Sequence, residues 1–426
     1  MFLSPIERMR CFVHSIICPA HILVAVSGGS DSVGLLIALH SVLLEKSFRG
    51  IRFSAVSVDH GMRDEAKDEV RYVSDLCFKL GIPHAIVIWK GSKPKTGLMA
   101  AAREARYALI SDHAVAISAT LVVTAHTFND QLETVYMRSQ RDSSGQGIGL
   151  AGISEIILYD LKLWIMRPFL QCLRSEIRSF LREKNISWCE DPSNVDDKFE
   201  RVRVRNLIGD SDFNLMFKKI EESQNWRIML NNHLSELIPQ YLKVYWQSVI
   251  SISRDVLMID PVLLFYLIRF SVAICGGQNF LPKYRSVERV IAFLQGGNRG
   301  CISIGRVIID VRSDFLWVTR AIRGLSIQNI SSEETAIWDR RNKFTSVSNR
   351  SIQMFPQAYR DMITPDHIPP IVVKRAFLSM SSQREGLPLT LFSRFLTSFD
   401  FPIAEAFFAA FGKKNIPKLP FYNGKV

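Results

Sequence analysis

The feature that most limits the fold of this chain is an apolar segment joined to a helix through a loop of serine and glycine. Residues 22–26 read Ile-Leu-Val-Ala-Val, which is typical of a buried parallel strand. They are followed by the loop Ser27-Gly28-Gly29-Ser30-Asp31-Ser32, and an apolar run from Val33 begins a helix. Glycine lets the backbone approach a ligand, and free N–H groups at a helix start attract negative charge. The order therefore predicts a phosphate site.

The same loop also indicates a divalent cation. Ser27, Ser30 and Ser32 offer hydroxyl donors for phosphate oxygens, whereas the carboxylate of Asp31 repels phosphate unless a cation lies between them. Mg²⁺ is the expected bridge. The loop is not a Walker A motif, because no lysine follows its glycines. An ordinary glycine turn before a helix is the simpler alternative, but the position directly after an apolar strand disfavours it.

Strand and helix patterns alternate through the first part of the chain. The sequence predicts strands at 53–59, 85–89 and 121–125, and helices at 65–80, 99–117 and 129–138. This order predicts an α/β domain with a doubly wound parallel sheet, which binds ligands beyond the carboxyl ends of its strands.

The alternation stops near residue 207, which suggests three domains. The α/β domain is expected at 1–207, a helical domain with a terminal hairpin at 208–327, and a small mixed domain at 328–426. Within the second domain the pattern is helical over 213–277 and again over 283–294, and a hairpin is predicted within 301–319. The polar stretch 328–334 is the expected linker.

Composition limits the partners and the compartment. Lysine and arginine outnumber aspartate and glutamate by 53 to 41, a net charge of +12. This excess favours a polyanionic partner, either nucleic acid or a membrane surface. The seven cysteines form no Cys-x-x-Cys pair, which disfavours a disulfide framework or a zinc ribbon and fits a reducing cytoplasm. No apolar stretch is long enough to span a bilayer.

Two more motifs fall at the expected carboxyl edge of the sheet. The second predicted strand ends in Val58-Asp59-His60-Gly61, where the glycine permits a sharp turn that brings the backbone to a nucleotide. A plain turn before a helix is the alternative. Arg103 and Arg106 lie three residues apart on one helical face, which suits phosphate groups. A solvated arginine face paired with Glu104 is equally compatible with the sequence.

A cluster of polar side chains joins the fourth predicted strand to its helix. It contains His126, Asn129, Asp130 and Glu133. Asp130 either caps the helix or holds Mg²⁺ opposite Asp31. A single histidine in such a place is more often structural than catalytic, but the four side chains together favour a functional site.

Basic residues and a flexible stretch complete the candidate site. The run from Trp188 to Asn194 precedes Arg201, Arg203 and Arg205, which alternate with small apolar residues. They form either a basic stripe for nucleic acid or a helix whose charges face water. The glycine-rich stretch 143–152 either closes over a substrate or only connects two elements.

In this order the motifs resemble those of the tRNA(Ile)-lysidine synthases, which are N-type ATP pyrophosphatases of the PP-loop superfamily. The match covers about the first half of the chain closely, and 281–320 and 337–340 more loosely. The serine-glycine loop is shared by the superfamily, and the ordered set is more specific. It consists of the loop, Val58 to Gly61, Ala102 to Tyr107, Thr124 to His126, Asp130 to Thr134, Arg167-Pro168, and Trp188 to Asn194 with the arginines that follow.

The resemblance implies a PP-loop, adenine nucleotide alpha-hydrolase-like fold and a two-step ligase reaction on cytidine 34 in the CAU anticodon of tRNA(Ile). ATP adenylates the cytosine C2 oxygen with release of pyrophosphate, and the ε-amine of free L-lysine then displaces AMP. The product, lysidine, changes codon recognition from AUG to AUA and charging from methionine to isoleucine. A cytoplasmic enzyme using ATP and Mg²⁺ is implied, with homodimerisation left open.

The resemblance also implies roles for individual residues. Catalytic roles fall to Asp31, Asp130, Arg106 and Arg205, and the two aspartates also hold the metal. Contacts to tRNA are expected from Arg103, Arg201, Arg203 and the domains beyond residue 207. Contacts to ATP are expected from Ser27, Gly28, Gly29, Ser30, Asp31, Ser32, Val58, His60 and His126.

The chain differs from the usual family pattern at five positions. Thr127 stands where many members have a second histidine, and Asn129 where they have an acid. Gly97 and Met99 stand where asparagine and glutamate are usual, and Val202 replaces an expected asparagine. The group that binds lysine is therefore not assigned from the sequence.

Two other functions are compatible with the phosphate loop. A tRNA-thiolating enzyme of the same superfamily would need reactive cysteines or a Cys-x-x-Cys iron–sulfur site, which this chain lacks. A non-catalytic RNA-binding protein would have no need to retain both Asp31 and Asp130. The sequence therefore favours the ligase.

Overall fold

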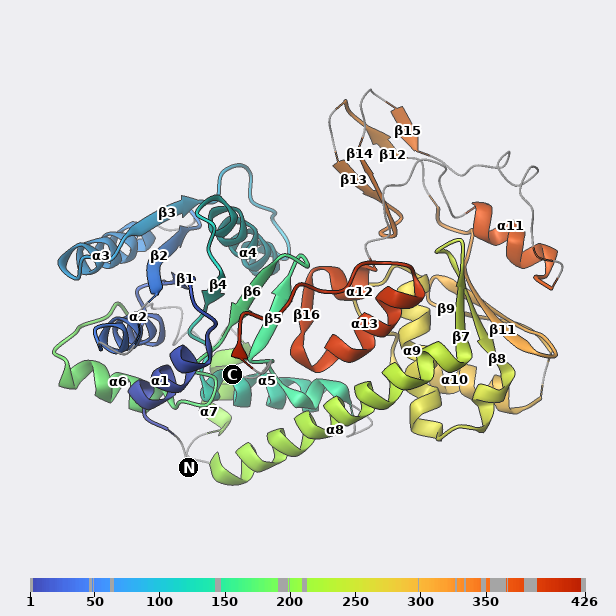
Figure 1. Ribbon diagram of the computed structural model, residues 1–426, viewed down its shortest axis with the longest axis horizontal. Helices are drawn as coiled ribbons and strands as arrows, with labels where there is room; N and C mark the ends of the chain where they lie inside the picture. Colours follow the sequence, from blue (N-terminus) through green and yellow to red (C-terminus); the bar gives the residue numbers. More distant parts are fainter. Residues whose placement is uncertain are drawn as a thin grey trace. The chain divides into compact units, whose positions relative to one another are not determined.

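The structure is a computed structural model that divides into two compact units, Met1–Trp226 with Pro417–Val426, and Arg227–Ile416 (Figure 1). It describes residues 3–45, 48, 50–61, 65–141, 147–190, 198, 200–208, 213–297, 299–325, 328–332, 335–345, 350–352, 365, 367–378 and 389–422. The boundaries at 207 and 327 stay predictions. None of the helices in the described ranges is both long and apolar enough to cross a membrane.

The first unit follows the predicted alternation of strands and helices. After α1 (Pro5–Ser15), its elements are β1 (Ala20–Ala25), α2 (Ser30–Leu43), β2 (Ile51–Asp59), α3 (Glu65–Lys79), β3 (His84–Ile88), α4 (Leu98–Ala116), β4 (Leu121–Val123), α5 (Phe128–Ser139), η1 (Ile148–Ala151), β5 (Ile156–Tyr159), β6 (Leu163–Met166), α6 (Arg174–Glu183) and α7 (Glu200–Ile208). The strands predicted at 53–59, 85–89 and 121–125 are confirmed as β2, β3 and β4. The helices predicted at 65–80, 99–117 and 129–138 are confirmed as α3, α4 and α5.

The strands of this unit form one sheet in the order β5-β6-β4-β1-β2-β3. The central strand β1 pairs in parallel with β2 and β4, with Ile22 opposite both Phe53 and Leu121. Ile22, Leu23 and Val24 are fully buried. This explains why residues 22–25 of β1 are all apolar, since helices cover a parallel sheet on both faces. The serine-glycine loop follows directly after the carboxyl end of β1.

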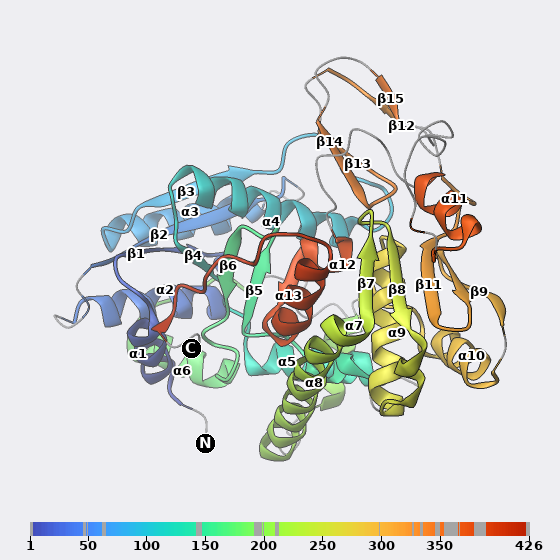
Figure 2. The same ribbon diagram turned by 45° about the vertical axis from the view of Figure 1, so that its right-hand side comes forward.

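Helices cover both faces of the sheet, as a doubly wound fold requires (Figure 2). On one face α2 packs against α1 and α6. On the other, α4 contacts β2, β3 and β6. Because β1, β2 and β4 are parallel, the loops that follow them lie at the same edge of the sheet.

One strand departs from the expected parallel arrangement. β5 runs antiparallel to β6, with Ile156 opposite Met166. The two strands are joined by a tight turn in which Asp160 and Leu161 have φ of 50° and 55°. The register leaves three residues, 160–162, between the paired Tyr159 and Leu163, and the positive φ values match the twist of the flanking strands. The sheet is parallel at its centre with an antiparallel β5.

Helix α8 (Phe213–Tyr241) leads to the second unit. The remaining elements are β7 (Leu242–Tyr245), β8 (Val249–Ser253), η3 (Arg254–Met258), α9 (Pro261–Cys275), α10 (Tyr284–Gln295), β9 (Gly300–Ile304), β10 (Val307–Val311), β11 (Phe315–Arg320), β12 (Gln328–Ile330), β13 (Thr335–Trp338), β14 (Asn342–Thr345), β15 (Arg350–Ile352), α11 (Pro370–Leu378), α12 (Thr390–Ser393), β16 (Phe395–Thr397), η4 (Ser398–Asp400) and α13 (Phe401–Ala410).

The second unit contains an antiparallel sheet in the order β7-β8-β11-β10-β9. The hairpin predicted within 301–319 is confirmed as β10 and β11, with Val311 opposite Leu316. The helix predicted at 283–294 is confirmed as α10. Trp317 on β11 is 1 % exposed and packs with residues of α11, among them Val372 and Phe377. The core of this unit therefore lies between the sheet and its helices.

Part of the helical prediction over 213–277 is wrong. Residues 242–253 form the β7–β8 hairpin, and its turn places Trp246 and Gln247 at φ of 50°. The strand conformation is favoured because consecutive residues of β8, Val249 to Ile252, are buried within the sheet. The linker expected at 328–334 begins as β12, which pairs with β15.

Several predicted features lie outside the described residues. They are the glycine-rich residues 143–146 and residues 191–194 of the run from Trp188 to Asn194. The described end of the glycine-rich stretch, 148–151, is the short helix η1.

Candidate nucleotide and substrate site

The serine-glycine loop connects β1 to α2 in a conformation that requires glycine at its first turn. Gly28 has φ +90°, which L side chains rarely adopt, and its carbonyl accepts the N–H of Cys189 at 2.9 Å. The hydroxyl of Ser32 accepts the N–H of Ser27 at 3.1 Å and donates to the carbonyl of Gly29 at 3.0 Å. Gly29 is the N-cap of α2 and supplies no side-chain cap. The helix therefore offers its N–H groups to an anion.

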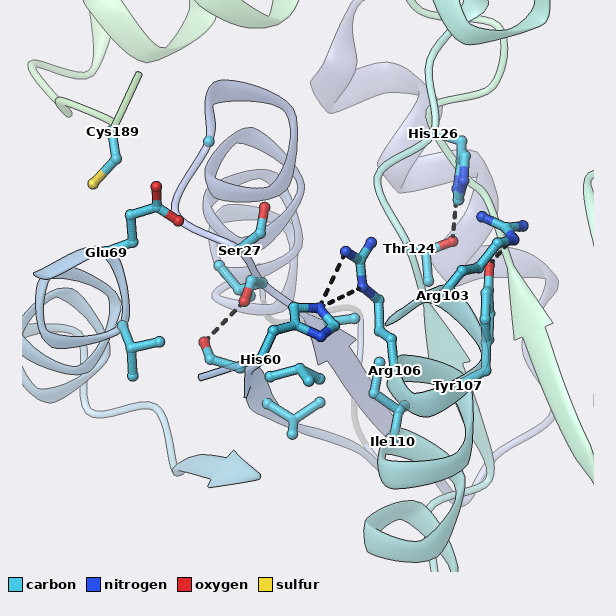
Figure 3. Close-up of a pocket in the computed structure, with 17 residues that line it drawn as sticks. Ser27, His60, Glu69, Arg103, Arg106, Tyr107, Ile110, Thr124, His126 and Cys189 are labelled. Carbon is cyan, nitrogen blue, oxygen red and sulfur yellow. Dashed lines mark hydrogen bonds between the residues drawn. The ribbon is translucent and has the colours of Figure 1, made fainter. Parts of the chain in front are cut away.

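A cavity of about 340 Å³ opens beside this loop (Figure 3). Its size is within the usual range for small-molecule sites. Its walls come from the carboxyl ends of β1, β2 and β4 and from helices α3 and α4. They are Ala25, Val26, Ser27, Gly29, Val56, Ser57, Val58, His60, Glu69, Val70, Arg103, Arg106, Tyr107, Ile110, Thr124, His126 and Cys189.

Two histidines of this cavity are held neutral. Burial, together with the neighbouring Arg106, lowers the pKa of His60 to about 4, and its Nε2 lies 3.3 Å from Nη2 of Arg106. Burial also lowers the pKa of His126 to about 3, with Arg167 contributing, and its Nδ1 bonds the hydroxyl of Thr124 at 3.1 Å. Figure 3 shows both contacts. The two rings act as hydrogen-bonding groups at neutral pH rather than as proton donors.

Arg103 and Arg106 both face the loop from α4, as their spacing predicts. The guanidinium of Arg103 lies 5.0 Å above the Tyr107 ring and donates to its hydroxyl at 3.4 Å. Both arginines line this cavity and a second one beside it. Met99, at the start of the same helix, is 66 % exposed and lines neither cavity.

The second cavity has a volume of about 740 Å³ and continues past the loop toward α6 and α7. It shares Ser27, Gly29, Arg103, Arg106, His126 and Cys189 with the first cavity. Its other lining residues are Ser30, Asp31, Ser32, Ala125, Asp130, Arg174, Arg178, Trp188, Glu190, Arg201, Val202, Arg205 and Asn206. Arginines outnumber carboxylates in this lining, which makes the cavity suitable for phosphate groups.

Asp31 and Asp130 are brought together in the second cavity by an arginine between them. Nε of Arg174 lies 2.8 Å from Oδ2 of Asp31, and its Nη2 lies 3.5 Å from Oδ1 of Asp130. Burial raises the pKa of Asp31, and Arg174 offsets part of that rise. Burial has the same effect on Asp130, but Arg174, His126 and the bonds from Thr127 outweigh it and lower the pKa of Asp130.

Asp130 has the first of the two roles considered from the sequence, that of capping α5. Its Oδ2 accepts the N–H of Thr127 at 2.8 Å and the Thr127 hydroxyl at 3.0 Å, which caps α5. Its other oxygen faces Arg174. Thr127, which replaces a histidine of the usual pattern, is fully buried and fixes this carboxylate.

Asn129 also has a visible structural role. Its Oδ1 accepts the backbone N–H of Arg174 at 2.9 Å, which ties the start of α6 to the start of α5. An acid at this position would supply the same acceptor. The difference at Asn129 therefore preserves the contact that a side-chain oxygen makes here.

Helix α7 separates the three arginines of the predicted stripe. Arg201 and Arg205 lie four residues apart and line the second cavity, and Nε of Arg205 lies 2.9 Å from Oε1 of Glu133. Arg203 is exposed, lines neither cavity and donates to the carbonyl of Lys198 at 3.0 Å. A helix turns about 100° per residue, so side chains two apart face opposite ways. Val202, the replaced asparagine, is buried.

Sequence reasoning missed Arg174 and Arg178. Both are on the first turns of α6 and line the second cavity, and Nε of Arg178 lies 3.4 Å from the hydroxyl of Ser30. A signal for Arg174 exists in the sequence, because a cation at a helix start opposes the helix dipole unless an anion is close. The partner itself, Asp31, lies 143 residues away in sequence.

The strand, the phosphate loop, and the cavity beside it define a nucleotide-binding domain of the PP-loop class. A family model described as a PP-loop domain matches residues 7–211. The match supports ATP as the nucleotide.

Two relatives place the chain more narrowly. A tRNA(Ile)-lysidine synthase of Rhizobium meliloti (strain 1021) is 34 % identical over 98 % of this chain and 97 % of its own length. A tRNA(Ile)-lysidine synthase of Mesorhizobium japonicum is 33 % identical over 93 % of each chain. The chain belongs to the tRNA(Ile)-lysidine synthase family.

Among solved structures, the U34-tRNA thiolase NcsA from Methanococcus maripaludis with its [4Fe-4S] cluster aligns with 52 % of this chain and 78 % of its own. The sequence identity is 13 % and the TM-score 0.43, values too low to support the thiolation alternative.

Proposed function

We propose that this chain ligates L-lysine to C2 of cytidine 34 in the CAU anticodon of tRNA(Ile) with ATP, and so forms lysidine. The similarity to lysidine synthases extends over almost the whole chain. The observation that carries the proposal is the pair of adjoining cavities. They share the phosphate loop, Arg103, Arg106 and His126, so a nucleotide in one presents its α-phosphate to a substrate in the other.

In the first step the cytosine C2 oxygen attacks the α-phosphorus of ATP. A bond forms between that oxygen and phosphorus, the α–β phosphoanhydride bond breaks, and pyrophosphate leaves with its electron pair. Negative charge develops on the phosphate oxygens. The N–H groups of α2 and the guanidinium groups of Arg106, Arg174 and Arg178 provide positive charge at the loop. These residues lower the barrier by holding phosphate in place.

In the second step the ε-amine of free lysine attacks C2 of the adenylated base. A carbon–nitrogen bond forms, the bond from C2 to the adenylate oxygen breaks, and AMP leaves. The amine must be neutral to attack, so a carboxylate near it aids proton removal. Asp31 and Asp130, which border the second cavity, are the acceptors that we propose as the alternative to their role in holding the metal.

Asp31 and Asp130 fit a magnesium ion. Mg²⁺ is commonly held by one or two carboxylates together with substrate phosphates, and both aspartates direct an oxygen to the same cation position, which Arg174 fills in this structure. In the residues that the structure describes, no three His, Cys, Asp or Glu side chains form a metal cage. When bound with ATP, the ion would neutralise charge on the phosphates.

The proposed partners follow from the same site. Arg201 lines the second cavity, where a polynucleotide backbone would pass, and Arg203 lies on the exposed side of the same helix. We propose that both arginines contact tRNA, as expected from the sequence. The compartment proposed for the enzyme is the cytoplasm, where tRNA and free lysine are available.

The experiment that tests the function is incorporation of labelled lysine into a tRNA with a CAU anticodon. The expected result is lysine- and tRNA-dependent release of AMP and pyrophosphate in equal amounts. The control is the same tRNA with position 34 changed from cytidine to uridine, which removes the target base. Labelling of the control, or no labelling of either, contradicts the proposal. Sulfur incorporation instead would favour the thiolation alternative.

A further inference from the structure

Arg174 is placed as the shared counter-ion of the carboxylates in the second cavity. Its three nitrogens face three acids: Nε lies 2.8 Å from Asp31, Nη2 lies 3.5 Å from Asp130 and Nη1 lies 3.9 Å from Glu133. Glu133 has a second partner in Arg205. For Asp31 and Asp130, the described part of the chain provides Arg174 as the one cation within ion-pair distance.

The guanidinium group of Arg174 can move, whereas the backbone of this residue is held in place. The N–H of Arg174 is held by Asn129 at the start of α6, whereas the side chain is 18 % exposed and borders the cavity. Four rotatable bonds separate the two ends. The head can therefore move to a new anion without a change in the helix.

We propose that Arg174 occupies the cation position between Asp31 and Asp130 in the nucleotide-free enzyme and leaves it when a polyphosphate binds. The inference rests on the proposed function for the metal role of the two aspartates. The phosphate oxygens become the new partner of the guanidinium, and the vacated position receives the divalent ion. Arg174 is a positioning residue that makes metal binding depend on nucleotide binding.

The balance of charges explains the dependence. A divalent ion that arrives alone must displace the guanidinium from three carboxylates and gives it no new anion. With a polyphosphate, the guanidinium gains charge-assisted bonds to phosphate, and the ion gains phosphate oxygens as ligands. The new bonds of the guanidinium and the new ligands of the ion then both favour the state in which polyphosphate and metal are bound together. Because coupling between binding sites is reciprocal, the metal also tightens nucleotide binding.

The test is a titration of the nucleotide-free, full-length protein with Mn²⁺, followed by electron paramagnetic resonance of the free ion. We expect Arg174→Gln to raise the affinity for Mn²⁺ at least about tenfold, because the two aspartates lose their resident cation. Arg174→Lys, which keeps the charge but lacks the fork, should give a smaller rise. Adding Asp31→Asn to Arg174→Gln should abolish the gain.

Arg182→Gln is the matched control, because Arg182 lies two turns along α6 and stacks on Trp188 instead of pairing with these acids. It should leave Mn²⁺ affinity unchanged. A second titration contains an ATP analogue with a non-cleavable α–β bond. The analogue should raise the protein's Mn²⁺ affinity by a larger factor in the wild type than in Arg174→Gln.

An unchanged affinity in both Arg174 variants overturns the proposal, as does an equal effect of the analogue on wild type and Arg174→Gln. If Arg174→Gln does not fold, as judged by circular dichroism, Arg174→Lys alone decides between a rise and no rise. Mn²⁺ binding requires neither tRNA nor lysine. A failure of lysine incorporation is therefore distinguishable from a failure of this inference.

Discussion

Arg205 and Glu133 form an unequal ion pair between α7 and α5. The Nε of Arg205 lies 2.9 Å from Oε1 of Glu133, yet the glutamate side chain is 2 % exposed and the arginine side chain 36 %. Without the arginine, the cation left to the buried carboxylate among the described residues is Arg174, at 3.9 Å. Without the glutamate, the arginine still reaches water. The two partners therefore contribute differently to stability.

We expect Arg205→Gln to lower the free energy of unfolding by about 1–3 kcal/mol, because it leaves a buried carboxylate poorly paired. Glu133→Gln should cost less than about 1 kcal/mol, because the remaining arginine stays solvated. Urea unfolding of both variants and of the double variant measures the difference. Equal losses in the two single variants would contradict the asymmetry.

Asp31→Asn should reduce tRNA-dependent pyrophosphate release by at least about 100-fold, because it removes a charged ligand from the phosphate loop. Binding of tRNA, measured on filters, should change little. Asp160→Asn is the control, since it makes the same chemical change in the β5–β6 turn, where asparagine tolerates φ of 50°. Undiminished pyrophosphate release by Asp31→Asn would remove this residue from the reaction.

Arg201→Gln should weaken tRNA binding and lower the slope of log affinity against log salt by about 0.7–0.9, the contribution of one phosphate contact. Arg203→Gln is matched in chemistry and helix. Because Arg203 faces away from the cavity, its substitution should reduce the slope less. The two slopes are compared over the same salt range. A larger effect at Arg203 would place the tRNA on the other face of α7.

Asn129→Asp should retain stability and activity, because a carboxylate also accepts the N–H of Arg174. Asn129→Ala leaves that N–H without its side-chain acceptor and should cost about 1 kcal/mol. Thermal unfolding measures the cost, and pyrophosphate release shows whether α6 still holds Arg174 in place. An alanine variant as stable as the aspartate variant would show that this contact is dispensable.

His126 should make the protein less stable in mild acid. Its pKa in the folded state is about 3, below the ordinary value of 6.5, so the unfolded chain binds more protons between these values. Stability is therefore complete above about pH 6.5 and falls as the pH is lowered toward 3. We expect His126→Asn to remove roughly 1–2 kcal/mol of the loss between pH 7 and pH 5. The urea midpoint is measured for the wild type and for His126→Asn at both pH values. An equal shift of the midpoint between pH 7 and pH 5 in the two proteins would exclude this effect.

The sequence predicts the centre of the α/β unit well because its signals are local. The apolar run of β1, the glycines of the loop and the start of α2 are consecutive, and each restricts the backbone by itself. The β7–β8 hairpin is different. Its turn depends on Trp246 and Gln247 adopting positive φ, which neither residue type indicates.

For the site, sequence motifs identify the loops but not the contacts between them. Ser27, Asp31, His126 and Asp130 are predicted near one another because strand ends share an edge. The role of Arg174 is not predicted, because it depends on the carboxylates of Asp31 and Asp130, which are distant in the sequence. The orientation of Arg203 also follows only once residues 200–208 are known to be helical.

The bond from Cys189 to Gly28 uses only main-chain atoms, the amide of one residue and the carbonyl of the other. Side-chain replacement at position 189 leaves it in place, unless the newcomer is proline, which has no N–H. A change of this side chain therefore alters the lining of both cavities but keeps the phosphate loop joined to the segment that begins at Trp188.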